Sequence, residues 1–180
     1  MSVDPLIARL VRGDPFALSE VYERHHARIR AFARRMVGNA SAEDLVQDVF
    51  MALPKAMRRF RGDCSIETFL LSIAANRSRH HARSLFRFRR AIGRVAEEPV
   101  SRRSRDAEEV ILQGELRAAL ERGIAKLSHN HRVTFVLCSV EERSSVEAAS
   151  ILGVPEGTVR TRLFHARQKL RDHLKRQGYG

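Results

Sequence analysis

Apolar residues recur at steps of three and four along most of this 180-residue sequence, and the alternation that marks a half-buried strand is almost absent. The pattern is clearest over residues 14–36. The periodic apolar residues there are Leu18, Val21, Tyr22, Ile29, Phe32 and Met36. These positions share one stripe of a helix and are its expected buried face. The sequence therefore predicts an all-α fold.

Two further helices are predicted in the N-terminal half. Ser41 and Asp44 resemble a capping box at the start of the second helix, and Ser65 is placed to cap the third. Pro54 lacks a backbone N–H, so we expect it to kink or shorten the second helix near Phe50. The expected buried residues are Leu45, Val49, Leu53 and Met57, followed by Ile66, Phe69, Leu70, Ile73 and Ala74. Together the three helices should form one compact bundle.

A basic segment separates two predicted domains. Between residues 83 and 105, eight arginines face only two glutamates, and Gly93 and Pro99 would break a helix. We expect a flexible linker over residues 87–107, after a first domain over 1–86 and before a second over 108–180. Acidic residues at the start of the second domain suit the N-terminal end of a helix. Its expected buried face is Leu112, Leu116, Leu120 and Ile124.

The overall charge restricts the class of partner. The chain has 33 Lys and Arg against 21 Asp and Glu, a formal net charge of +12, which predicts a polyanionic partner. No apolar run reaches the roughly 18 residues of a membrane span, and residues 1–10 lack a signal-peptide pattern, so we expect a cytoplasmic protein without membrane insertion. Cys64 and Cys138 lack metal-site spacing and are expected to be free thiols. We expect no metal site and no cofactor.

Residues 144–170 have the form of a helix-turn-helix. Ser144 and Glu147 can cap a short helix, small residues allow a second helix to pack closely across it, and Gly153 suits the tight turn. The expected buried seam of the second helix is Val159, Leu163, Ala166 and Leu170. The opposite face carries Arg160, Thr161, Phe164, His165 and Gln168, flanked by Arg162 and Arg167. Such a face suits a DNA major groove, and the alternative is a solvated basic helix.

Two segments of the chain resemble the extracytoplasmic-function sigma factors, the small two-domain members of the bacterial sigma-70 family. Residues 14–17 (DPFA), Tyr22 and residues 42–50 (AEDLVQDVF) are similar to conserved region 2 of that family. Residues 153–163 (GVPEGTVRTRL) are similar to the recognition element of region 4. The two motifs occur in the family's order, with a basic linker between them, and the resemblance covers most of the sequence.

The resemblance implies a promoter-specificity subunit without enzymatic activity, which an anti-sigma factor would restrain. Region 4 would bind the −35 promoter element through the exposed helix face described above. Region 2 would bind the clamp helices of core RNA polymerase through Asp44, Gln47, Asp48 and Phe50. It would also hold the melted −10 strand through Asn76, Arg77, Arg79, His80, His81 and Arg83. Cations, amides and imidazoles can grip phosphates and contact exposed base edges.

Two other function classes stay open at this point. A conventional transcription regulator would bind an operator as a dimer through the C-terminal helix-turn-helix. A recombinase would need a nucleophile or converging carboxylates, whereas the acids here lie at helix starts.

The linker of a sigma factor must also be long enough for its promoter. Elements about 25 base pairs apart lie about 85 Å apart, and the two domains cover part of this span and leave about 60 Å. Residues 87–108 reach at most about 70 Å when extended, so we expect a largely unfolded linker.

Overall fold

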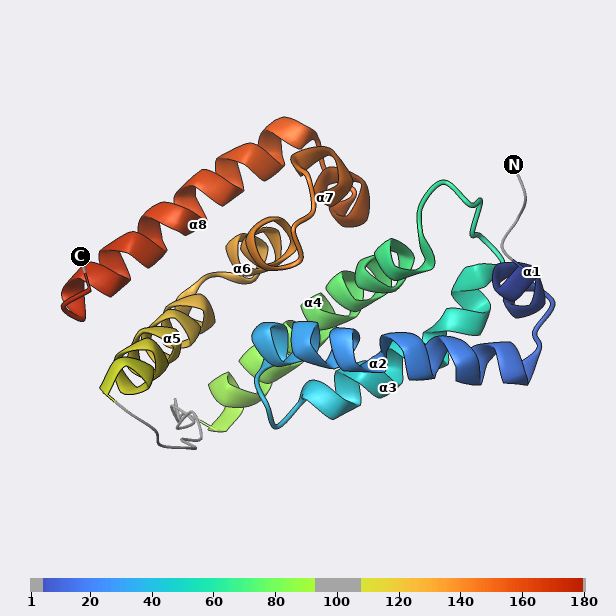
Figure 1. The fold of residues 1–180 in the computed structure, drawn as a ribbon, viewed down its shortest axis with the longest axis horizontal. Helices are drawn as coiled ribbons and strands as arrows, with labels where there is room; N and C mark the ends of the chain where they lie inside the picture. Colours follow the sequence, from blue (N-terminus) through green and yellow to red (C-terminus); the bar gives the residue numbers. More distant parts are fainter. Residues whose placement is uncertain (1–4, 93–107, 180) are drawn as a thin grey trace. The chain divides into compact units, whose positions relative to one another are not determined.

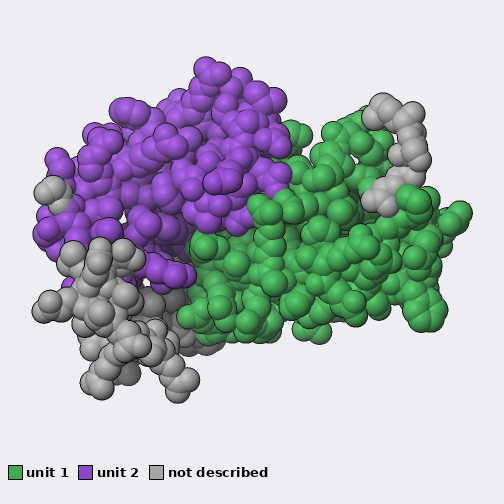
Figure 2. Space-filling model, in the orientation of Figure 1, with its two compact units in different colours: residues 1–83, 150–153 green, residues 84–149, 154–180 purple. Residues whose placement is uncertain are grey.

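The computed structural model describes residues 5–92 and 108–179, and all regular structure in these ranges is helical (Figure 1). Side chains are described for residues 5–82 and 114–179. The chain divides into two compact units, residues 1–83 with 150–153 and residues 84–149 with 154–180 (Figure 2). Across the described ranges, no helix is long and apolar enough to cross a membrane. The predicted all-α class is confirmed.

The first four helices are α1 (Pro5–Val11), α2 (Pro15–Val37), α3 (Ala42–Met57) and α4 (Ile66–Ile92). Asp14 starts α2, because its carboxylate accepts hydrogen bonds from the backbone N–H of Phe16 at 2.9 Å and from Nε of Arg9 at 2.8 Å. Gly38 ends α2 with a φ of 83°, a conformation that glycine adopts without strain. The core of this unit lies where α1, α2 and α3 pack together, and α4 contributes Leu70, Leu71, Ala74 and Ala75 to it.

Most of the predicted apolar stripes are buried. In α2, Val21, Ile29, Phe32 and Met36 are buried, whereas Leu18 is half-buried and Tyr22 is exposed at its edge. In α3, all four predicted core residues (Leu45, Val49, Leu53 and Met57) are buried. Both stripes follow the 3.6-residue period of the helix, which is why the sequence located them correctly.

The structure differs from the predicted cap of α3 and from the predicted shortening of this helix. Ser41 stands at the N-cap position, but its side chain makes no capping hydrogen bond. Pro54 does not shorten the helix, which continues to Met57. Pro54 is exposed, while Leu53 and Met57 in the same last turn are buried, so burial of that turn outweighs the single backbone hydrogen bond that proline removes.

The fourth helix begins as predicted and ends later than predicted. The hydroxyl of Ser65 accepts a hydrogen bond from the backbone N–H of Thr68 at 3.1 Å, which confirms Ser65 as the cap. The helix then continues to Ile92, six residues into the segment expected to be an extended linker over 87–107. Arginine is a good helix former, so the loss of apolar rhythm in this stretch did not mean the loss of helix. Residues 93–107 of the predicted linker lie outside the described residues.

The second unit contains α5 (Glu108–Lys126), α6 (His129–Phe135), a π-helical turn η1 (Val136–Val140), α7 (Ser145–Leu152) and α8 (Glu156–Arg176). Helices α5 and α6 both pack against α8. Arg132 holds the end of α5, because its guanidinium donates hydrogen bonds to the backbone carbonyls of Ile124 and Leu127, each at 3.1 Å. Ser128 stands at the N-cap of α6, but its hydroxyl contacts Nδ1 of His131 at 3.1 Å and makes no capping bond.

The buried face of α5 agrees with the predicted one only in part. Ile124 is buried and Leu120 is half-buried as expected, and the side chain of Leu112 lies outside those described. Leu116 is 42% exposed, whereas Ala119 and Gly123, which were not predicted, are buried. Gly123 lies under α8: a Cβ added to it would meet Cδ2 of His173 at 2.8 Å. The small residues of α5 thus allow α8 to approach closely, and the larger leucine is displaced to the edge.

We predict that Gly123→Ala destabilises the chain. The added methyl would also lie 2.9 Å from Cδ2 of Leu170, so α8 must shift or its side chains must leave their rotamers. Such overpacking costs about 1 to 2 kcal/mol of unfolding free energy, measurable by urea denaturation. Gly114→Ala in the same helix is the matched control, because nothing lies within 4 Å of a Cβ at that position. Equal stability of the two variants would contradict the close approach.

A second prediction concerns pH. Burial lowers the pKa of His173 in α8, and burial likewise lowers the pKa of His131 and His25. As the pH falls below about 6.5, the ordinary pKa of histidine, these histidines therefore bind protons more readily in the unfolded chain than in the folded chain. The stability contributed by the neutral imidazoles is complete above that pH and is lost as the pH falls through the lowered folded-state values. We expect the melting temperature to decrease from pH 7 to pH 5, and His173→Gln to reduce this decrease.

Candidate nucleic-acid and protein interfaces

The helix-turn-helix forms as the sequence predicts. The backbone N–H of Ser144 donates to Oε2 of Glu147 at 2.9 Å, and the backbone N–H of Glu147 donates to Oγ of Ser144 at 3.2 Å. This reciprocal pair is a capping box at the start of α7. Gly153 turns the chain with a φ of 62°, and α8 begins at Glu156. The turn therefore fixes where the second helix starts relative to the first.

Glu156 ties the two helices of this motif together. Oγ of Ser145 in α7 donates to Oε1 of Glu156 at 2.6 Å, and Arg160 donates to the same oxygen from Nε at 3.0 Å and from Nη2 at 2.6 Å. The hydrogen bond from Ser145 and then the one from Arg160 hold the pKa of Glu156 below its usual value. Arg160 is consequently oriented while its side chain stays 70% exposed.

The buried seam of α8 agrees with the predicted one, apart from one residue at its edge. Val159, Ala166 and Leu170 are buried, and Leu163 is half-buried. The seam also includes His173, one helical turn beyond Leu170, which the apolar pattern did not include. The opposite side of α8 is thereby left to solvent.

The exposed face of α8 brings together most of the residues predicted for the −35 element. Arg160, Thr161, Phe164, His165, Arg167 and Gln168 are exposed, and Arg162 is half-buried. Phe164 is 65% exposed and places an apolar ring among these polar side chains. Nη2 of Arg167 donates a hydrogen bond to Oγ of Ser139 in η1 at 3.3 Å.

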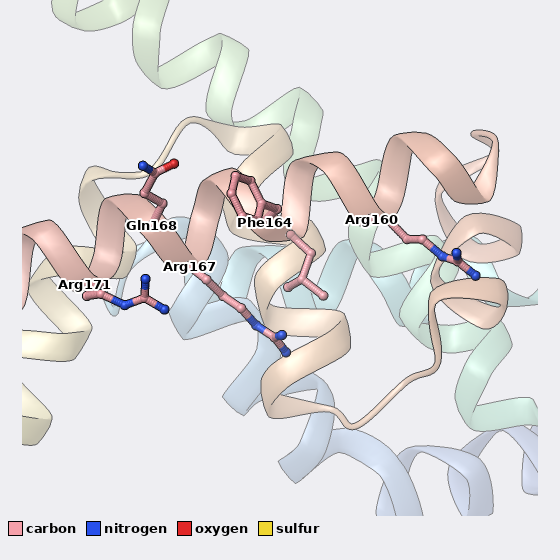
Figure 3. Close-up of a pocket in the computed structure, with 6 residues that line it drawn as sticks. Arg160, Phe164, Arg167, Gln168 and Arg171 are labelled. Atoms are coloured by element: carbon pink, nitrogen blue, oxygen red, sulfur yellow. The ribbon is translucent and has the colours of Figure 1, made fainter.

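A shallow pocket of about 390 Å³ runs along this face (Figure 3). Its lining comprises Arg160, Leu163, Phe164, Arg167, Gln168 and Arg171. Arg171 was missed by the sequence analysis, although its spacing of seven from Phe164 and four from Arg167 puts it on the same face. Three guanidinium groups around an aromatic ring and an amide form a surface suited to phosphates and base edges.

The exposed face of α3 has the opposite chemistry. Asp44 and Gln47 are exposed, and the side chain of Asp48 is 45% exposed. Phe50, which was predicted to belong to this face, is buried and contacts Tyr22 edge-on, with ring centroids 4.8 Å apart. Met51 is 72% exposed and lies one turn from Gln47 and Asp48. The structure thus puts methionine, and not phenylalanine, among the acidic and amide groups.

The residues predicted to hold the −10 strand lie along α4. Asn76, Arg77 and His80 are exposed, whereas Arg79 and His81 are half-buried. Nε2 of His81 lies 2.9 Å from Oδ2 of Asp48, so His81 contacts α3. The backbone of Arg83 belongs to α4, but its side chain is not among those described.

Within the described residues, no group of three His, Cys, Asp or Glu side chains could hold a metal ion. Cys64 and Cys138 are free, as predicted. Burial raises the pKa of both thiols, and Asp63 adds to the effect at Cys64, so each cysteine favours the protonated form. Neither cysteine has the surroundings of an activated nucleophile.

Comparison with known proteins identifies both halves of the chain. The family described as "Sigma-70 region 2" matches residues 21–88, and "Sigma-70, region 4" matches residues 117–170. The ECF RNA polymerase sigma-E factor of Escherichia coli (strain K12) is 29% identical over 172 residues, which cover 92% of this chain and 90% of that protein. The RNA polymerase sigma-H factor of Pseudomonas aeruginosa is 28% identical, with the same coverage of each chain.

Two solved structures have a similar fold. The sigma factor RpoE in complex with the anti-sigma factor NepR, from Bartonella quintana, has a TM-score of 0.70 and 25% identity, and the match covers 87% of this chain and 96% of that chain. CnrH in complex with the cytosolic domain of CnrY has a TM-score of 0.66 and 27% identity, and the match covers 94% of this chain and 95% of that chain. With regions 2 and 4 both matched over more than half of its length, the chain belongs to the sigma-70 family as an RNA polymerase sigma factor of the extracytoplasmic-function type.

Proposed function

We propose that this chain binds core RNA polymerase and directs it to promoters by recognising the −10 and −35 elements. One observation carries the proposal: the chain exposes two helix faces of opposite chemistry. The face of α3 is acidic and amide-bearing, which disfavours DNA and suits a basic protein surface. The face of α8 is basic with an exposed aromatic ring, which suits the major groove.

The −35 element is proposed to bind the exposed face of α8. Arg160 and Arg167 supply guanidinium forks for guanine edges or phosphates, and Phe164 supplies apolar contact for a thymine methyl group. Arg171 extends the basic surface by one turn toward the flanking phosphates. The remaining members of the proposed surface are Thr161, Arg162, His165 and Gln168.

The −10 element is proposed to bind α4. Asn76 and His80 are four residues apart, so they share one exposed face of the helix. Their amide and imidazole groups can hydrogen-bond exposed base edges, while Arg77, Arg79 and Arg83 supply charge for the phosphates of a single strand.

Core polymerase is proposed to dock on the exposed face of α3. Asp44, Gln47 and Asp48 provide the polar contacts, and Met51 provides the apolar centre in place of Phe50. Methionine is a flexible, polarisable side chain that is frequent at adaptable binding surfaces, and the polar groups around it can help to exclude water when a partner binds.

The domain boundaries are proposed with a shorter linker. Because α4 continues to Ile92, residues 93–107 are what remains of the predicted linker, and a fully extended chain of that length would reach at most about 50 Å. The helical residues 87–92 add about 9 Å at 1.5 Å per residue. The total is close to the span of about 60 Å estimated from the promoter, so this linker has little length to spare.

The sigma factor RpoE was solved in complex with the anti-sigma factor NepR, and CnrH was solved in complex with the cytosolic domain of CnrY. We propose that an anti-sigma factor likewise restrains this chain, in the cytoplasm, and that the chain has no enzymatic activity of its own. Purification from the native host should recover such a partner with the full-length chain. Repeated recovery of the chain without one would argue against restraint of this kind.

Run-off transcription with purified core polymerase on genomic fragments tests the main proposal. Discrete transcripts should appear only when both core polymerase and this chain are present. Band-shift assays separate the alternatives: a conventional regulator binds duplex DNA tightly alone, whereas a sigma factor binds promoters well only with core enzyme. Metal-dependent DNA cleavage by the purified chain would instead identify a DNA-processing enzyme.

A further inference from the structure

One hydrogen bond joins two residues that the sequence predicted to contact different partners. Nε2 of His81 in α4 lies 2.9 Å from Oδ2 of Asp48 in α3, across 33 residues of sequence. Asp48 belongs to the proposed polymerase-binding face, whereas His81 was predicted to hold the −10 strand. The two side chains therefore contact each other in the chain by itself.

The chemistry of the pair decides which group remains free for a ligand. An ionised carboxylate only accepts hydrogen bonds, so the hydrogen lies on Nε2 of His81, and this N–H donates the hydrogen bond to Oδ2. The second oxygen of Asp48, Oδ1, keeps its capacity to accept from a partner. The side chain of Asp48 is 45% exposed and that of His81 only 22% exposed. The carboxylate of Asp48 is thus oriented by a hydrogen bond and still accessible. His81 is largely buried, and its Nε2 is already engaged in that hydrogen bond.

The position of His81 on α4 agrees with this division. His81 follows the buried residues Ala74 and Ser78 by seven and three positions, so it lies on the flank of α4 near the core. His80, the next residue, is exposed and shares its face with Asn76. Two adjacent histidines therefore lie in different surroundings, and only His80 lies on the exposed face proposed for DNA.

We propose that His81 is a positioning residue for polymerase binding, which orients the Asp48 carboxylate for core polymerase and takes no part in recognition of the −10 strand. This inference rests on the proposed docking role of Asp48. Its physical basis is preorganisation: a carboxylate already fixed by a hydrogen bond loses less rotamer freedom when the partner binds. An arginine or lysine of the partner would then meet an acceptor that is already aligned.

The test measures affinity for core polymerase in full-length variants. His81→Leu removes the donor and should weaken binding about fivefold, the range expected when one side chain loses its preorganisation. His81→Gln, whose amide can donate from a similar reach, should restore most of the affinity. His80→Ala is the matched control and should leave the affinity for core polymerase unchanged. A merely structural role for the imidazole would not be rescued by glutamine, and that result would overturn the proposal.

Asp48→Asn separates this inference from the proposed function. If Asp48→Asn does not weaken core binding, the docking role of Asp48 fails. If Asp48→Asn weakens binding and His81→Leu does not, only the positioning role fails. Where both weaken it, the double variant should be no weaker than Asp48→Asn alone, because His81 acts through that carboxylate. Fully additive losses would overturn the proposal.

A second measurement concerns DNA. With core polymerase at saturating concentration, the His81→Leu holoenzyme should discriminate between −10 sequences as the unaltered holoenzyme does, whereas His80→Ala should reduce that discrimination. A loss of −10 discrimination in His81→Leu would return this residue to the DNA-binding face and overturn the inference. Thermal unfolding of each variant shows whether the bundle has kept its fold.

Discussion

Replacing Phe50 by alanine will lower the unfolding free energy of the full-length chain by about 3 kcal/mol, the usual cost of removing a buried phenyl ring. Phe50 is buried against Tyr22, which itself stacks on His26 with ring centroids 5.1 Å apart. Loss of the ring leaves a cavity and removes an aromatic contact between α2 and α3. Urea denaturation followed by circular dichroism measures the change.

Met51→Ala, one position further on, should have the opposite profile. Met51 is 72% exposed, so its truncation should leave the unfolding free energy within about 0.5 kcal/mol of the original. Its affinity for core polymerase should fall about tenfold, as expected for an apolar anchor at the centre of an interface. If Phe50→Ala weakened core binding without loss of stability, the phenyl ring would itself belong to the interface and the assignment to Met51 would be wrong.

The sequence alone could have predicted that Met51, and not Phe50, lies on the exposed face of α3. Successive residues of a helix are rotated by about 100°, so Phe50 lies about 120° around α3 from Asp44, near the middle of the exposed face, and Met51 lies about 20° from Asp44. Residues 42–50 form one motif because they are consecutive in the sequence, whereas the surface of a helix brings together residues that are three or four positions apart. Helical geometry alone therefore separates the core residue from the surface residue.

The helix-turn-helix was predicted correctly because its signals also lie close together in the sequence. The capping box of Ser144 and Glu147 and the turn at Gly153 depend on residues within a few positions of one another. The part of the buried face of α5 that the sequence did not predict depends on distant residues. Gly123 is buried because His173 and Leu170 of α8 lie against it, and no pattern within α5 carries that information.

The pairing of His81 with Asp48 also lies beyond what one sequence can predict. The residues are 33 positions apart, and the contact requires the register of α3 against α4. Sequence reasoning could place each residue on a helix and give each a plausible ligand. Only the packing of the helices shows that His81 and Asp48 are hydrogen-bond partners.

Arg160→Ala will reduce discrimination at one position of the −35 element by about 2 kcal/mol, the value of a bidentate contact between arginine and guanine. In the chain by itself, Nε and Nη2 of Arg160 bind Oε1 of Glu156. Nη1 and the second hydrogen of Nη2 remain for O6 and N7 of guanine, so the carboxylate orients the fork without blocking it. Holoenzyme binding to promoters with each −35 base replaced in turn gives the measurement.

Arg171→Ala is the matched control, because it removes the same guanidinium from the same face of α8, further toward the C-terminus. If Arg171 contacts phosphates, its loss should weaken binding to all −35 variants equally and reduce the salt dependence of log K by about one. Arg160→Ala should instead abolish the preference at its own position. Equal losses across all sequences for both variants would mean that α8 binds the duplex by charge alone and that the −35 sequence is recognised by other residues.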